Sequence, residues 1–151
     1  MAVQQVPRAQ EESVAVTEDT DWDEVWHLEQ QVFVKGVPLE LTESTRALLL
    51  RTARQVAIHD EEARVALQQE YTAAALLREI RRRIREGSHR LSGVLDRYYP
   101  LRDAGDLEGA RKLMEDLLAV EAVPLYREQA EILLEKLAIR GAAPHSRKHR
   151  R

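Results

Sequence analysis

One stretch of apolar residues limits the possible folds of this chain more than any other feature. From Leu77 to Leu101, apolar and small residues recur at alternating spacings of three and four, which are the a and d positions of a heptad repeat. The stripe comprises Leu77, Ile80, Ile84, Gly87, Leu91, Val94, Tyr98 and Leu101. This spacing predicts one long helix over about residues 72–104. Because the stripe needs cover from other parts of the chain, this helix is the expected axis of the fold.

The composition favours helices and narrows the classes of function. The chain has 151 residues, five prolines and no cysteine, and it is rich in residues of high helix propensity, so we predict an all-α fold. Its formal net charge of -3 argues against a chain built as a whole to wrap nucleic acid. The lack of cysteine excludes thiolate chemistry and fits a cytoplasmic location. No apolar run approaches about eighteen residues, so we expect neither a signal peptide nor a membrane span.

Capping residues divide the chain into six expected helices. The signals are Asp21 with Glu24 as a capping box, Thr42 as an N-cap, Gly105 followed by the N-cap Asp106, and Pro124 in a first turn. The expected helices cover about residues 22–35, 43–58, 61–69, 72–104, 107–121 and 124–139. We expect both tryptophans, Trp22 and Trp26, to anchor the core. Pro100 removes a backbone hydrogen bond to Asp96, which predicts a bend between these residues.

The two ends of the chain differ in composition from its middle. Residues 1–20 are polar and acidic without a helical period, and we expect a disordered lead-in. Residues 21–139 are the predicted helical bundle, built around the long central helix and ending in a repeat-like helical hairpin. Residues 140–151 hold several basic residues and no acid, and we expect a disordered basic tail. Such a tail can bind phosphate backbones or acidic surfaces, serve solubility, or derive from an expression tag.

Arginines gather on the flank of the apolar stripe. The candidate partner-binding residues are Arg78, Arg81, Arg82 and Arg85, which follow one another at helical spacing. Their local excess of positive charge suits an acidic partner. The alternative interpretation is a solvated face, in which ion pairs four residues apart support the helix. The expected pairs are Glu79 with Arg83 and Glu86 with Arg90.

Two Glu-x-x-His motifs are the sharpest catalytic signal. Glu24 with His27, and Glu86 with His89, have the spacing of di-iron ligands in helical bundles. Both pairs point away from the apolar faces of their helices, whereas metal ligands converge inside a bundle, so we expect no metal site. The sequence contains no Gly-rich phosphate loop, metalloprotease His pair or nucleophile elbow. We therefore predict that the protein is not an enzyme and uses no cofactor.

Several segments together carry a family resemblance over about residues 21–137. They read LELTE (39–43), RALLLR (46–51), ARQVAI (53–58), LLREIRRRIREGS (76–88), LRDAGDLEGAR (101–111), VE (120–121) and VPLYRE (123–128). This set resembles the myxobacterial DUSAM domain family, which has no assigned function and so implies no catalytic residues. The hairpin around GDLEGA (105–110) is similar to the turn of a tetratricopeptide repeat, although no second copy follows at the period of about thirty-four residues.

These patterns favour one function over two alternatives. We expect a non-enzymatic interaction or regulatory scaffold module that holds a partner protein, either along the arginine row or in a groove between the terminal helical pair and the long helix. The main alternative is an accessory nucleic-acid-binding protein that uses the same arginines and the basic tail. A third interpretation is homo-oligomerisation through the heptad stripe, where Gly87 would let two backbones approach. We expect no membrane partner.

Overall fold

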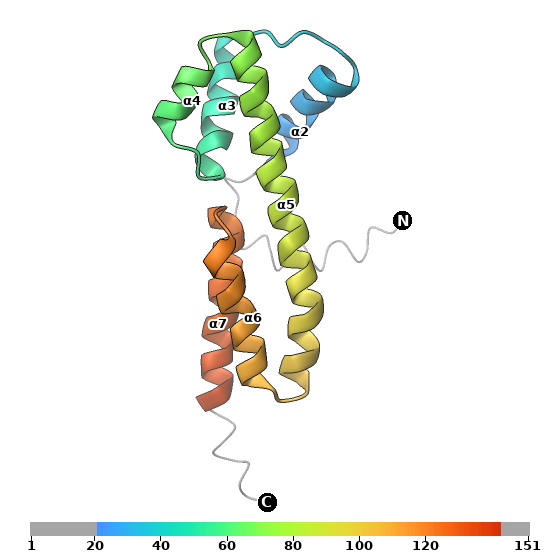
Figure 1. Ribbon diagram of the computed structural model, residues 1–151, viewed down its shortest axis with the longest axis vertical. Helices are drawn as coiled ribbons and strands as arrows, with labels where there is room; N and C mark the ends of the chain where they lie inside the picture. Colours follow the sequence, from blue (N-terminus) through green and yellow to red (C-terminus); the bar gives the residue numbers. More distant parts are fainter. Residues whose placement is uncertain (1–20, 143–151) are drawn as a thin grey trace, which may run out of the picture. The chain divides into compact units, whose positions relative to one another are not determined.

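The computed structural model describes residues 21–142 (Figure 1). This range is helical throughout its regular structure and contains no strand, which confirms the predicted all-α class. The elements are α2 (Asp23–Glu29), the π-helix η2 (Gln30–Val34), α3 (Glu43–Gln55), α4 (Asp60–Ala66), α5 (Glu70–Asp103), α6 (Leu107–Val120) and α7 (Pro124–Ala142). Helix α5 is the expected long helix. The predictions for residues 1–20 and 143–151 lie outside the described range.

The contacts of the chain group into two compact units. Within the described range, the first holds residues 21–86 together with Val123–Leu125, and the second holds Gly87–Ala122 with residues 126–142. Helix α5 contributes its first half to one unit and its second half to the other. The sequence predicted one domain over residues 21–139. The division arises because different helices cover the two halves of the α5 stripe.

The heptad stripe of α5 is largely buried, as its spacing predicts, and Val94 and Leu101 are half-buried. Leu77, Ile80 and Ile84 are buried in the first unit, and Leu91 and Tyr98 in the second. These side chains are thus packed within the chain itself. Homo-oligomerisation through the heptad stripe stays a prediction. The helix also continues through Pro100 to Asp103 without interruption, and the bend expected there stays a prediction.

Capping fixes the ends of α3 in the first unit. The Thr42 hydroxyl accepts a hydrogen bond from the Thr45 amide at 3.1 Å, as the sequence predicts. At the other end, Ala57 has a φ of 67°, and the Ile58 amide reaches back to the Ala53 carbonyl at 2.9 Å. This pattern is a Schellman motif with alanine, rather than glycine, in the left-handed position.

The first predicted helix differs from the observed one. Helix α2 ends at Glu29 and continues as the π-helix η2. The Asp21–Glu24 capping box is absent because Trp22 occupies the N-cap position, and its side chain does not cap the helix but donates to Gln55 at 2.8 Å. The expectation that both tryptophans anchor the core is wrong for Trp26, whose exposed fraction is 44%. Neighbouring side chains on a helix point about 100° apart, so the face that buries Val25 turns Trp26 outward.

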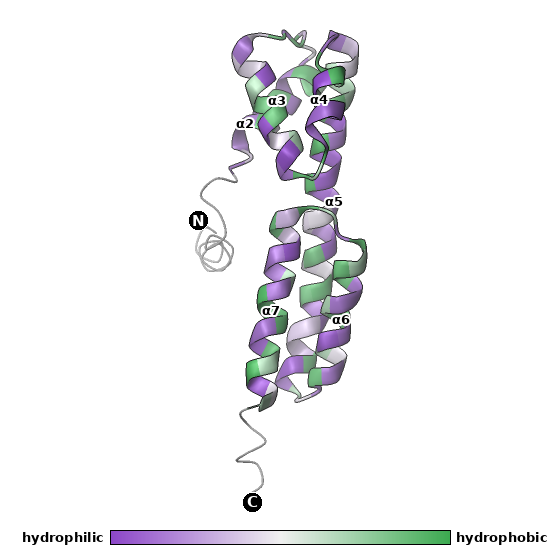
Figure 2. Cartoon of the chain, turned by 90° about the vertical axis from the view of Figure 1, so that its left-hand side faces the viewer, coloured by the Kyte–Doolittle hydropathy of each residue, from purple (hydrophilic) through white to green (hydrophobic). Residues whose placement is uncertain are grey.

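The second unit contains the last half of α5 with α6 and α7, and the last two helices lie side by side in both views (Figure 1 and Figure 2). The predicted hairpin is confirmed: Gly105 has a φ of 87°, and the Asp106 carboxylate accepts a hydrogen bond from the Gly109 amide at 2.9 Å. Helix α7 begins at Pro124 as expected. Arg127 ties α7 to the end of α6, since its guanidinium donates to the Leu118 and Glu121 carbonyls.

Candidate partner-binding surface

The four candidate arginines lie in the first unit but do not form one free basic row. Arg78, Arg81 and Arg85 contact the α2–η2 segment, whereas Arg82 contacts carboxylates of its own helix. The row that the sequence shows is therefore divided between two sides of α5. Each side balances its positive charge differently.

Glu29 joins the α2–η2 segment to α5. One carboxylate oxygen accepts a hydrogen bond from the Arg81 Nε at 2.7 Å, and the other lies 3.4 Å from the Arg85 Nη1. The Arg81 and Glu29 side chains are only 10% and 14% exposed, so this pair is largely removed from water. Beside it, the Arg78 guanidinium stacks over the Phe33 ring at 4.1 Å. These contacts hold the α2–η2 segment against the long helix.

Arg82 lies among carboxylates on the other side. Its guanidinium contacts Glu79 at 2.6 Å and Glu86 at 2.8 Å, and Arg83 adds a second contact to Glu79 at 2.8 Å. The hydrogen bond from Arg82 is the main reason that the pKa of Glu79 is lowered, while partial burial opposes it. Glu79 in turn raises the pKa of Arg82. On the Arg82 side of α5, the arginines therefore form a solvated face whose ion pairs support the helix.

Only one of the two expected helix-supporting pairs forms. Glu79 pairs with Arg83, but Glu86 pairs with Arg82. The Arg90 Nε instead lies 3.1 Å from the carboxylate of Glu121, whose side chain is fully buried in the second unit. Tertiary packing therefore overrides the local pairing at Arg90.

The two Glu-x-x-His motifs lie on the surface. Glu24, His27, Glu86 and His89 are all exposed, and Glu24 pairs with Arg51 at 3.2 Å. Within residues 21–142, no group of three or more His, Asp or Glu side chains is placed to hold a metal ion.

One feature of the surface was not predicted from the sequence. It is the exposed apolar segment, formed by Trp26, Val34 and Val37. These side chains are 44%, 67% and 44% exposed. Trp26 is exposed because its neighbour Val25 takes the buried side of α2. Beyond Glu29, η2 changes the helical phase, so a pattern of 3.6 residues per turn does not place Val34. The exposed apolar segment lies in the same part of the chain that Glu29 holds against α5.

No helix within residues 21–142 combines the length and the apolar character needed to cross a membrane.

These features define an all-α protein whose described part presents paired charges and exposed apolar side chains rather than a metal-binding cluster. Residues 20–137 match the family described as a protein of unknown function (DUF2379), and the chain belongs to this family. No curated protein and no solved structure matches the chain.

Proposed function

We propose that this protein is a non-enzymatic interaction module that binds a partner protein through the exposed apolar segment, Trp26, Val34 and Val37. The exposure of these three large side chains within twelve residues is the observation that carries the proposal. The centres of protein interfaces are enriched in aromatic residues, and tryptophan is among the residues that most often dominate binding energy.

The anchoring of the α2–η2 segment supports this role. Glu29 is held by Arg81 and Arg85, and Phe33 lies under Arg78, so the segment is ordered before a partner arrives. A surface that is already ordered loses less conformational entropy on binding. Among the candidate arginines on this side of α5, Arg85 is 58% exposed and makes only a long contact of 3.4 Å to Glu29, so its charge lies at the edge of this surface.

The nucleic-acid alternative has less support from the described residues. Binding to a phosphate backbone depends on Lys and Arg side chains that are free to replace counterions. Arg81, Arg82 and Arg85 already have carboxylate partners within the chain. Anisotropy of a labelled random duplex at low and moderate salt tests the alternative, which requires an affinity that falls steeply as salt rises.

The interaction role is tested by placing a photoreactive amino acid at position 34 of the full chain. The partner that crosslinks in native cells is identified by mass spectrometry, purified, and titrated by calorimetry. Because a central interface tryptophan contributes at least about 2 kcal/mol, Trp26→Ala should weaken the affinity roughly thirtyfold. The matched control is Tyr71→Ala, which truncates an 84% exposed aromatic residue elsewhere in the first unit and should change the affinity less than about twofold. Equal affinities for wild type and Trp26→Ala, or no crosslinked partner, would contradict the proposal.

The finer assignments made from the sequence belong to this proposal as well. We propose that the DUSAM resemblance describes the same family as the match, since it covers residues 21–137 and the match covers residues 20–137. The turn between α5 and α6, with Gly105 and Asp106, supports the repeat-like character of the hairpin. A cytoplasmic location is proposed with the interaction role.

A further inference from the structure

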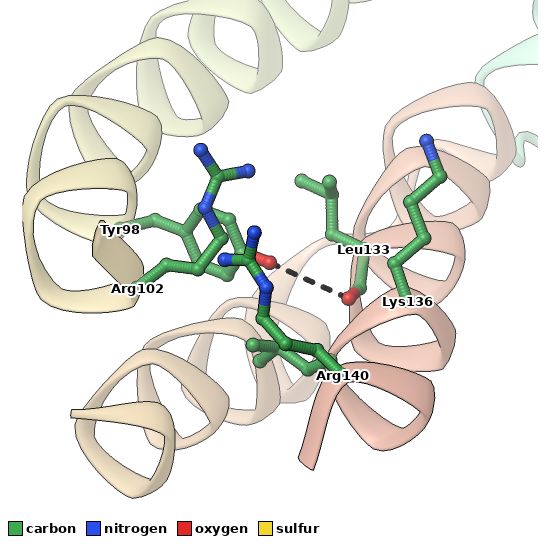
Figure 3. A pocket seen from close by; sticks show the side chains of 6 residues that line it. Tyr98, Arg102, Leu133, Lys136 and Arg140 are labelled. Carbon is green, nitrogen blue, oxygen red and sulfur yellow. Dashed lines mark hydrogen bonds between the residues drawn. The ribbon is translucent and has the colours of Figure 1, made fainter. Parts of the chain in front are cut away.

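A small recess lies within the second unit, between α5 and α7 (Figure 3). Its volume is about 130 Å³, and it is lined by Tyr98, Arg102, Leu133, Lys136, Leu137 and Arg140. Figure 3 shows Arg102 reaching from α5 and Arg140 from α7, with the hydroxyl of Tyr98 directed toward Leu133. Three of the six lining residues are cations and none is a carboxylate.

The positive charge of the recess is only partly balanced inside the protein. The Arg102 guanidinium binds the Asp103 carboxylate through Nε at 3.0 Å and Nη2 at 2.8 Å. Within residues 21–142, Lys136 and Arg140 make no ion pair with any carboxylate. These two residues are four apart on α7, so both present their charge on the same side of that helix.

The C-terminal ends of α5 and α7 balance part of the positive charge of these side chains. Helix α5 ends at Asp103 and α7 at Ala142, and each helix C-terminus carries a partial charge of about -0.5, which favours nearby cations. Two such partial charges do not balance Lys136 and Arg140. They also do not explain why the cations of two different helices line one hollow that contains a tyrosine hydroxyl.

Tyr98 supplies the recess with a polar group that can still donate. Its hydroxyl lies 3.4 Å from the Leu133 carbonyl, which is longer than the 2.5–3.0 Å usual for O–H···O hydrogen bonds. The phenol is therefore weakly engaged and can donate to a closer acceptor. Burial raises the pKa of Tyr98, against the opposing effect of Arg102 and Arg140, so the donor proton remains in place at neutral pH.

We propose that this recess binds a phosphate-class oxyanion, held by Arg102, Lys136 and Arg140 and by a hydrogen bond from Tyr98. Guanidinium groups match the geometry of phosphate oxygens, and an ammonium adds a further positive charge. The volume lies below the roughly 300–1,000 Å³ of pockets for drug-sized ligands, which favours a single phosphoryl group over a whole nucleotide. Free phosphate and the phosphoryl group of a monoester share this chemistry. The proposal concerns the second unit and does not rest on the exposed apolar segment.

The test is a calorimetric titration of the full chain with inorganic phosphate and, separately, with O-phosphoserine, in buffers of matched ionic strength. The double variant Lys136→Gln, Arg140→Gln changes two exposed side chains and should weaken binding at least about tenfold, since it removes two charge-assisted hydrogen bonds to the anion. Tyr98→Phe removes only the hydroxyl and should weaken binding severalfold. Circular dichroism checks that each variant is folded.

The matched control is Lys112→Gln, which removes a 75% exposed cation of α6 outside the recess. It should leave the affinity within about twofold of wild type, because surface charges far from a bound ion are screened by salt. Tighter binding of phosphoserine than of phosphate would identify a monoester as the source, and the reverse would identify free phosphate. The proposal is overturned if neither anion binds, or if the double variant binds as tightly as wild type. It is also overturned if Lys112→Gln loses as much affinity as the double variant, which would mean that net charge alone attracts the anion.

Discussion

The ring of Tyr126 on α7 lies directly against the backbone of α5 at Gly87. A Cβ atom placed on Gly87 would lie 2.5 Å from the ring Cδ2 and 2.6 Å from Cε2, well inside van der Waals contact. Tyr126 is only 7% exposed, so its ring has little room to move away. Gly87 therefore allows the close approach of the two helices in the second unit.

We predict that Gly87→Ala destabilises the protein by about 1–3 kcal/mol, because the cost of overpacking exceeds the helix propensity gained. Urea unfolding followed by circular dichroism measures the change. The matched control is Gly93→Ala in the same helix, where an added Cβ would meet no atom within 4 Å. This control should stabilise the protein by up to about 1 kcal/mol. Two equally stabilising substitutions would mean that Tyr126 does not constrain position 87.

Gly87 also shows how far the sequence could predict the fold. It occupies a d position of the heptad stripe, and the stripe correctly indicated a long helix buried along one face. The helix caps at Thr42 and Asp106 could also be predicted from the sequence, because a cap depends on residues only three positions away. These local features were predicted well, whereas the Asp21–Glu24 capping box and the Glu86–Arg90 pair, which are also local, did not form.

Features set by contacts between residues distant in the sequence were not predicted. The sequence could not show that Arg81 pairs with Glu29, which is 52 residues away. It also could not show that Arg90 pairs with the buried Glu121 instead of with Glu86. The π-helical turn after Glu29 has no composition signal, so the exposure of Val34 was missed as well. These outcomes depend on which helices pack together, and helical periodicity does not report that.

Helix α5 ends in a Schellman motif like that of α3, since the Asp106 amide donates to the Leu101 carbonyl at 2.9 Å. The two motifs predict opposite effects of exchanging alanine and glycine. Ala57 holds a φ of 67°, which is unfavourable for a residue with a Cβ, whereas Gly105 holds a φ of 87° without that cost. We expect Ala57→Gly to stabilise the protein by up to about 1 kcal/mol and Gly105→Ala to destabilise it by about 1–2 kcal/mol. Thermal unfolding of both variants measures the shifts. A lower melting temperature for Ala57→Gly would argue against the left-handed conformation at that position.

The Glu29–Arg81 pair predicts a larger loss of stability than other ion pairs of the first unit. Glu29→Gln leaves the largely buried Arg81 without its carboxylate, which should cost about 2–4 kcal/mol. Glu24→Gln is the matched control, because it removes an exposed carboxylate that pairs with Arg51 and should cost less than about 1 kcal/mol. Guanidinium unfolding followed by tryptophan fluorescence measures both. Similar small losses for the two variants would show that Arg81 is better solvated than its 10% exposure indicates.

The lowered pKa of Glu79 predicts how the stability of the protein depends on pH in acid. The hydrogen bonds from Arg82 and Arg83 favour the ionised carboxylate in the folded state, whereas in the unfolded chain the group titrates near its ordinary value of 4.5. Between these two values the unfolded state binds more protons than the folded state, so stability decreases as pH falls. The contribution of Glu79 is therefore complete above about pH 4.5 and is lost as the pH falls through the folded-state value.

Glu79→Gln removes this titration. We expect the variant to be less stable than wild type at neutral pH and to lose less further stability between neutral pH and acid, since its side chain carries no charge to neutralise. Urea unfolding at a series of pH values gives the two slopes. Glu128→Gln is the matched control, because Glu128 is an exposed glutamate that makes no ion pair within residues 21–142, and this variant should keep the wild-type slope. If Glu79→Gln also kept that slope, the carboxylate would not be held ionised by Arg82, and the balance of charge on that side of α5 would need another explanation.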